Sequence, residues 1–179
     1  MEAGFYPSGT KSGKMLQQYA RHFSITELDY TWFQIPRAEA VERCRQQVPQ
    51  EFLFAAKLTR TLTHEIDPQQ WSDQALLYRD GVEPLIRSGQ LIAMLTQLSP
   101  SFHRNAPNRK YLATLLDSLY GLSLAIEFRH RSWANDRVFA ELDRRQVTLV
   151  SVDIPDLPDL FPSLDVITNS DLFYVSFHG

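Results

Sequence analysis

Short apolar runs alternate with amphipathic segments along the chain. Six runs are rich in β-branched, aliphatic or aromatic residues over lengths that are typical of strands. They occupy positions 24–33, 52–60, 91–102, 122–133, 147–155 and 172–179. Because the apolar positions within these runs are nearly continuous, the runs predict strands that are buried on both faces, as in a parallel sheet.

The segments between these runs carry apolar residues at helical spacing. Leu16 and Tyr19, for example, lie three residues apart at the start of an apolar stripe. The same criterion predicts helices over positions 16–23, 36–48, 76–86, 112–119 and 135–142. Gly121 is placed to end one of these helices, and Asn135 or Asp136 to begin the last.

Alternating strands and helices predict an α/β fold, either an open doubly wound sheet or a (β/α) barrel. Polar residues lie at or near the C-terminal end of every predicted strand: Glu27 and Asp29, Lys57, Gln97, Glu127 and Arg129, Asp153, and His178. A barrel builds its site from many strand ends at this face, whereas an open sheet places its ligand at one switch point. We therefore predict a TIM-barrel-like fold with parallel strands and outer helices, formed by one domain over residues 1–179.

The period of two along a strand predicts which polar side chains share a face. Glu127 and Arg129 are expected to point together, with Phe128 on the opposite side. The same rule groups Glu27 with Asp29 and Thr31, Ser151 with Asp153, and Ser176 with His178. The apolar neighbours Leu28, Val152 and Phe177 are then expected to face the helices.

Composition and charge narrow the classes of partner. The chain has 179 residues and a formal charge of −3, so it offers no global electrostatic reason to bind a polyanion. Its one cysteine, Cys44, cannot form an intramolecular disulfide, and no apolar run approaches the roughly 20 residues that span a bilayer. We expect a protein of the reducing cytoplasm that has no membrane partner, and nucleic acid is the less favoured ligand. Oligomeric state stays open.

Six stretches occur in an order that resembles a known family: ITELDYTWFQIP, FLFAAKLTRTLTH, LTQLSPSF, AIEFRHRSW, VSVD and FYVSFHG. Together they look like the domain of unknown function 72 family, whose bacterial members are called YecE-like. The resemblance implies a TIM-barrel-like fold, in agreement with the alternation of strands and helices, and it implies little about the reaction. It also implies that the chain lacks the family's first strand and its C-terminal part, so we expect an incomplete barrel.

The resemblance further implies a more acidic site than the family's. Where the family tends to have Asn after the first glutamate this chain has Asp29, and where the family tends to have Arg before the final His-Gly it has Ser176. Four carboxylates would then face two fixed cations, Lys57 and Arg129. Such an imbalance needs compensation by a proton, a metal ion, a charged His178 or a nearby arginine. Arg60 and Arg131 are the arginines available.

Two classes of function fit the predicted cluster. In the first, the protein is an enzyme that acts on a small phosphate- or carboxylate-bearing substrate, with Glu127 and Asp153 as acid/base groups. Substrate binding would fall to Glu27, Asp29, Lys57, Gln97, Arg129 and His178. In the second, the protein is a non-catalytic barrel that binds an anionic ligand or a nucleic acid strand. A separate alternative for Glu127 and Arg129 is an ion pair that only orients the end of the strand.

A divalent metal ion is a further alternative, and the cofactor is otherwise unknown. Carboxylates and His178 are suitable ligands, but Lys57 and Arg129 would repel a cation, and the sequence has no HExxH or paired-histidine spacing. We interpret Cys44 as a core residue on an apolar helix face. His64 and His130 follow strands by several residues, which is more typical of solvated or capping side chains than of catalytic ones.

Overall fold

The computed structural model describes residues 6, 9–155 and 157–177. Its strands are β1 (Ile25–Leu28), β2 (Leu53–Lys57), β3 (Leu91–Gln97), β4 (Leu124–Glu127), β5 (Thr148–Leu149), β6 (Ser151–Asp153) and β7 (Val175–Phe177). Its helices are α1 (Met15–Tyr19), α2 (Tyr30–Phe33), α3 (Ala38–Arg45), α4 (Arg60–Thr63), α5 (Trp71–Arg87), α6 (Ala106–Ser118) and α7 (Asp136–Arg144). Two short 3-10 helices cover Ser12–Lys14 and Arg131–Trp133.

All paired strands run parallel. The first five form one sheet in the order β1-β2-β3-β4-β5, and β6 pairs with β7. Val150 lies between β5 and β6: its amide donates to the Ile126 carbonyl of β4, whereas the amide of Ser151 donates to Tyr174. The single strand predicted over 147–155 therefore changes partner at Val150 and appears as two. The result is an α/β, TIM-barrel-like arrangement that is not closed.

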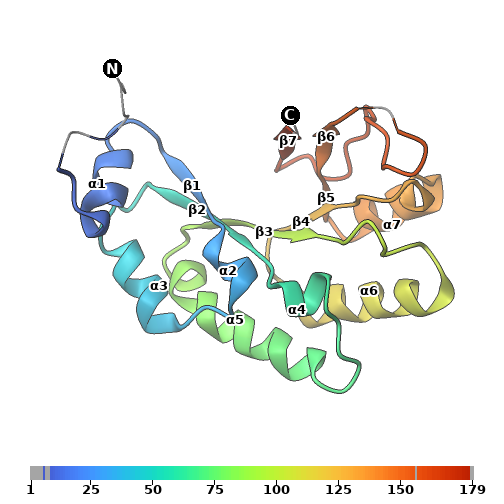
Figure 1. Ribbon diagram of the computed structural model, residues 1–179, viewed down its shortest axis with the longest axis horizontal. Coiled ribbons are helices and arrows are strands. Elements are labelled where there is room, and N and C mark those ends of the chain that lie inside the picture. The colour runs from blue at the N-terminus through green and yellow to red at the C-terminus, as the bar shows by residue number, and fades with distance from the viewer. Residues whose placement is uncertain (1–5, 7–8, 156, 178–179) are drawn as a thin grey trace.

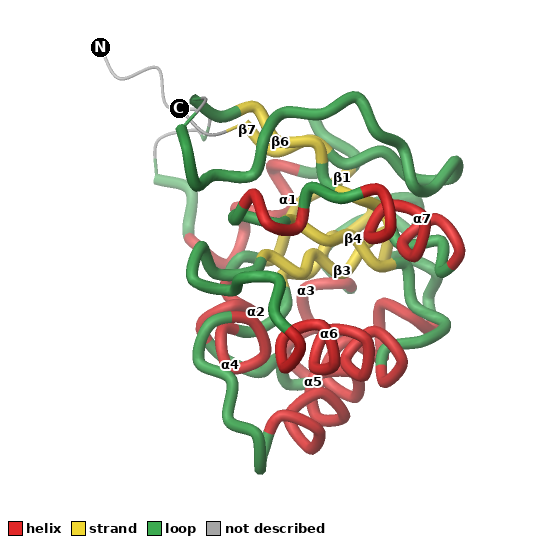
Figure 2. The backbone as a smooth tube through the Cα atoms, turned by 90° about the vertical axis from the view of Figure 1, so that its right-hand side faces the viewer, coloured by secondary structure: helices red, strands yellow, loops and turns green. Residues whose placement is uncertain are grey.

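The helices cover one face of the five-stranded sheet. In both views α3, α5 and α6 gather on one side, while β6 and β7 lie on the other (Figures 1 and 2). The main core is formed where Tyr78 and Val82 of α5 and Leu115 of α6 pack with Met94 and Ile126 of the sheet. A second cluster packs Leu28 of β1 against Val41, Phe52, Phe54 and Leu85. This packing fixes the strand ends that carry the polar residues.

Several local predictions are confirmed. The predicted helix over 76–86 lies within α5, which accommodates both Gly81 and Pro84. Asn135 is the N-cap of α7, and its side chain accepts a hydrogen bond from the amide of Arg137. Gly121 has a φ of 85°, the left-handed conformation that glycine adopts at a helix end.

The strand predicted over 24–33 is wrong in its second half. The chain leaves β1 after Leu28 and turns into α2. Thr31 is fully buried there, and its hydroxyl lies 2.6 Å from the carbonyl oxygens of both Leu28 and Lys57. The strand propensity of this β-branched and aromatic segment is overridden by its packing against the end of β2. Asp29 and Thr31 are therefore not on the strand face of Glu27.

A second correction concerns Phe177 on β7. It was expected to face the helices, but its side chain is 77% exposed. The described part of the chain contains no helix long and apolar enough to cross a membrane.

Candidate functional site

Glu127 is the most enclosed charged residue at the strand ends. It closes β4, is fully buried, and lies in register with Gln97, the last residue of β3. The Gln97 amide donates to Glu127 Oε1 at 3.0 Å, and Arg129 Nε lies 2.5 Å from the same oxygen. Arg129 keeps 24% of its side chain exposed. The buried Glu127 carboxylate therefore orients the side chains of Gln97 and Arg129, and Arg129 extends from it toward solvent.

Glu27 is held at a second strand end by groups from three segments. Tyr174 donates its phenolic hydrogen to Glu27 Oε2. Lys57 Nζ lies 3.9 Å from Glu27 and 3.5 Å from Asp29, whose own side chain is 73% exposed. Burial, more than any other cause, raises the pKa of Glu27 above its usual range, and the Asp29 carboxylate adds to this. Glu27 thus differs from Glu127 in being partly accessible.

Tyr174 connects the two glutamates, although the sequence analysis did not single it out. Its pKa is raised first by burial, then by its hydrogen bond to Glu27, and also by the negative charges of Glu127 and Asp29. The phenol therefore stays protonated at neutral pH and lies within the electrostatic reach of both glutamates. Tyr174 lies directly before β7, two residues from Ser176, so the period of two is a weak signal for it.

His64, which the sequence suggested to be a solvated or capping residue, lies close enough to this cluster to be affected by its charges. It directly follows α4, at the C-terminal side of β2. Its pKa is lowered by partial burial first, then by the positive charge of Arg129, and also by Lys57. Glu65 acts in the opposite direction. The two cations at different strand ends therefore act on one imidazole.

The other predicted residues are placed less centrally. Asp153 closes β6 as expected, but its side chain is exposed. His178 lies outside the described residues. Arg60 pairs with Glu65 at 3.5 Å, and Arg131 donates to the Pro158 carbonyl. Among the described residues, the cations that pair with carboxylates of the strand-end cluster are Lys57 and Arg129, not these two arginines.

Metal-binding and thiol chemistry gain no geometric support from the described residues. Among them, no group of three or more His, Cys, Asp or Glu side chains is arranged to hold an ion. Cys44 is a free, half-buried thiol on α3, and burial raises its pKa, so the thiol stays protonated at neutral pH.

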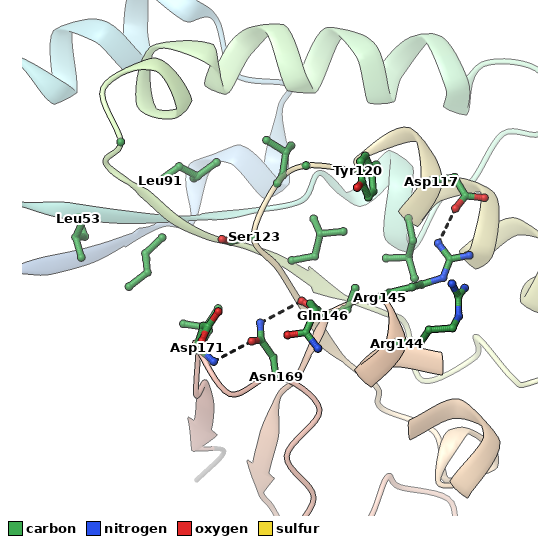
Figure 3. Close-up of a pocket in the computed structure, with 18 residues that line it drawn as sticks. Leu53, Leu91, Asp117, Tyr120, Ser123, Arg144, Arg145, Gln146, Asn169 and Asp171 are labelled. Atoms are coloured by element: carbon green, nitrogen blue, oxygen red, sulfur yellow. Dashed lines mark hydrogen bonds and ion pairs between the residues drawn. The ribbon is translucent and has the colours of Figure 1, made fainter. Parts of the chain in front are cut away.

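A large hollow of about 910 Å³ lies at the opposite end of the sheet. It is lined by residues at the starts of strands, including Leu53, Leu91 and Leu124, and by a polar rim that contains Arg145 and Asn169. Figure 3 shows these polar side chains engaged with the protein itself: Arg145 with Asp117, and Asn169 with the backbone of Gln146 and Asp171. The strand-end cluster therefore lies outside this hollow.

Two curated bacterial proteins are similar to this chain in sequence. The protein YunF of Bacillus subtilis strain 168 is 31% identical over 132 residues, which make up 72% of this chain and 47% of YunF. YecE of Escherichia coli K12 is 33% identical over 118 residues, or 64% of this chain and 41% of YecE. The chain thus spans less than half the length of these curated relatives.

Solved structures of two bacterial proteins are also similar to this chain. A DUF72 family protein from Enterococcus faecalis V583 matches with a TM-score of 0.85 and 29% identity, covering 92% of this chain and 63% of that protein. One from Thermotoga maritima MSB8 matches with a TM-score of 0.82 and 32% identity, covering 97% and 68%. The family described as protein of unknown function DUF72 matches residues 1–179, and the chain belongs to this family.

Proposed function

We propose that the strand-end cluster binds a small anion that carries a phosphate or carboxylate group, and that Glu27 exchanges a proton with the bound molecule. The supporting observation is that Lys57 ends β2 and Arg129 follows β4, the two strands that flank β3 in the sheet. Each is only partly exposed, at 18% and 24% of its side chain, and both positive charges act on His64. Two fixed cations that share one partly desolvated place are suited to hold an oxyanion.

The cations are already paired, so a ligand must compete with carboxylates. Glu127 is fully buried against Arg129 and cannot leave, but Arg129 has further guanidinium nitrogens for a second partner. Asp29 is largely exposed, so it can turn into water and release Lys57. Glu27 with its raised pKa contributes less negative charge than an ordinary glutamate. The cluster can therefore become net positive toward a ligand.

In this proposal Glu27 takes the acid/base role that the sequence assigned to Glu127. A proton-exchanging group must reach the bound molecule, and Glu127 has no exposed surface. Glu127 instead positions Arg129 and Gln97. Asp153, exposed on β6, is retained as a candidate at the rim of the site.

Titration calorimetry with inorganic phosphate and with a phosphate monoester tests the binding step. Lys57→Gln should weaken binding about tenfold, the equivalent of one charge-assisted hydrogen bond, whereas Lys110→Gln on the exposed surface of α6 should not. Asp29→Asn should strengthen binding, because it removes the competing carboxylate from Lys57. Equal affinities in all four proteins, or no binding at millimolar concentration, would overturn the proposal.

The proton-exchange step needs a separate measurement. A panel of phosphate and carboxylate esters should contain a compound that is consumed by the wild-type protein and is bound but not consumed by Glu27→Gln. Retention of full turnover in Glu27→Gln would remove Glu27 from the chemistry. Binding without consumption of any compound would favour the non-catalytic anion-binding barrel.

A further inference from the structure

His64 lies beside the proposed anion site in a fixed orientation. Its ring packs edge-on against Trp32, with 5.3 Å between ring centroids and 89° between planes. Its Nδ1 is 3.0 Å from Thr63 Oγ1. The residue thus has one nitrogen in contact with Thr63 of α4 and its ring in contact with Trp32 of α2, although the residue is exposed.

The contacts of Thr63 favour one neutral tautomer of His64. Thr63 is fully buried, and its hydroxyl lies 3.1 Å from the Thr59 carbonyl, to which it can donate its single hydrogen. The tautomer of His64 that satisfies both contacts of the Thr63 hydroxyl then carries its hydrogen on Nδ1. In the neutral ring, Nε2 then holds the free lone pair and is the position where a further proton binds.

The charged groups around His64 favour this neutral form. Arg129, which follows β4, and Lys57 of β2 both oppose protonation, as does partial burial. Glu65 favours protonation, but it is paired with Arg60 at 3.5 Å, which limits its effect. On the side of the ring that contacts α2, His64 meets Trp32, which is uncharged. The cations that repel a proton from His64 are those proposed to hold the anion.

We propose that His64 is a third anion-binding group of this site, and that it takes up one proton at Nε2 when a dianionic, phosphate-like group binds between Lys57 and Arg129. The idea rests on the proposed anion site and adds its ligand class and its pH dependence. A bound anion cancels the positive potential that Lys57 and Arg129 produce at His64. These cations then no longer oppose the protonation of His64. The imidazolium then donates a hydrogen bond from Nε2 to the ligand, while Nδ1 stays bonded to Thr63.

The proton balance gives the direction of the pH effect. The proton comes from the surrounding buffer, and no covalent bond of the ligand is made or broken. The pKa of His64 is higher with ligand than without, so proton uptake occurs at pH values between these two. Affinity for a dianion should therefore fall as the pH rises through this window, which begins below the ordinary histidine value of 6.5 because the pKa of unliganded His64 is lowered.

Inorganic sulfate is the appropriate probe, because it remains a dianion throughout this range and does not itself titrate. Calorimetry of sulfate binding at pH 6.5, repeated in buffers of different ionisation enthalpy, measures protons taken up per ligand. The wild-type protein should take up a substantial fraction of one proton. His64→Gln should bind sulfate about tenfold more weakly and take up almost none, as expected for the loss of one charge-assisted hydrogen bond.

His22→Gln is the matched control. His22 is exposed and precedes β1, at the opposite end of the strands, so its substitution should leave both affinity and proton uptake unchanged. Melting curves of all three proteins establish that they are folded. A histidine NMR titration gives an independent measurement: sulfate should raise the pKa of His64 in the wild-type protein.

The two proposals fail in different ways. If sulfate does not bind at all, the anion site itself is wrong, and the role of His64 is overturned together with it. If sulfate binds but no proton is taken up, and His64→Gln binds as well as wild type, the role of His64 is wrong while the anion site stands.

Discussion

Two glutamates of the site are held in opposite ways. Glu127 is fully buried and its charge is matched by Arg129 at 2.5 Å, with Gln97 as a further donor. Glu27 is partly accessible, receives a hydrogen bond from Tyr174, and has a raised pKa. Burial thus fixes one carboxylate as a structural anchor and makes the other responsive to pH.

The buried ion pair leads to a prediction about stability. Arg129→Ala leaves the Glu127 carboxylate in the core without its cation, which should lower the free energy of unfolding by about 3–5 kcal/mol. Glu127→Gln preserves shape and removes the charge, so it should cost less. Urea unfolding of both variants measures the difference. An Arg129→Ala protein as stable as wild type would contradict this account of the pair.

The raised pKa of Glu27 leads to a pH-dependent effect. Its folded-state pKa lies above the ordinary 4.5, so the folded protein binds more protons than the unfolded chain as the pH rises from that value. This group's contribution to stability therefore falls through that window. The stability of Glu27→Gln relative to wild type, measured by urea unfolding, should increase as the pH rises above 4.5.

Glu39→Gln provides the control for this measurement, because it removes a carboxylate from the exposed side of α3. Its stability difference from wild type should change less with pH. A Glu27→Gln difference that is independent of pH would show that the environment of Glu27 does not favour the protonated form.

Sequence reasoning located the strand-end residues but not all of their neighbours. Lys57, Gln97 and Glu127 lie at the ends of their strands because parallel strands present polar residues where the apolar core ends. Which of these residues become neighbours depends on the register between strands, and the pattern of apolar and polar positions does not specify that register. Tyr174 and His64 reach the cluster through long-range packing, so their local sequence carries only a weak signal.

At the scale of elements, α5 approaches the chain before α3 at Gly81. A Cβ atom added to Gly81 would lie 2.1 Å from the carbonyl oxygen of Pro36. Real Cβ atoms do not come so close to a backbone oxygen. The absence of a side chain therefore permits the packing of α5 and α3, and it outweighs the poor helix propensity of glycine.

Gly81→Ala should destabilise the protein even though alanine favours helices by about 1 kcal/mol. The clash requires a backbone shift, whose cost is about 1–3 kcal/mol or more. The melting temperature should fall in Gly81→Ala and stay unchanged in Gly13→Ala, because a Cβ atom at Gly13 meets nothing within 4 Å. Equal melting of both variants would mean that α5 can move away from Pro36 at little cost.

Elements were predicted best where the periodic pattern was long. The helix that became α5 and the strand that became β3 follow from apolar spacing, and Asn135 from capping chemistry. The prediction that the strand continues after Leu28 was wrong, because α2 is stabilised by contacts of Thr31 with the end of β2 rather than by its own propensity. The break at Val150 was also not predictable, since it reflects which strand is the neighbour on either side.

At the scale of the whole molecule, the strands form a five-stranded and a two-stranded sheet. Among the described residues, β1 is an outer strand of the first sheet, and β7 pairs only with β6 in the second. Phe177 is 77% exposed and Val175 37% exposed on β7, so an unpaired edge coincides with apolar side chains. Edges of this kind promote pairing with other chains.

The isolated chain should therefore self-associate as its concentration rises. A double substitution, Val175→Lys with Phe177→Lys, should suppress this association, since lysine on an edge strand opposes pairing. Tyr120→Lys, which alters an exposed aromatic residue elsewhere, should have no such effect. Sedimentation velocity over a range of concentrations measures all three. Identical behaviour would assign any association to another surface.

The hydrogen bond between Tyr174 and Glu27 also affects the order of folding. It joins residues 147 positions apart, so the entropy lost in closing that loop must be offset by contacts formed earlier. The sheet from β1 to β5 can pair step by step between strands that are neighbours along the chain, whereas this contact requires the segment around Tyr174 to dock beside β1. The proposed anion site would therefore be assembled only after that docking, and ligand binding would report it.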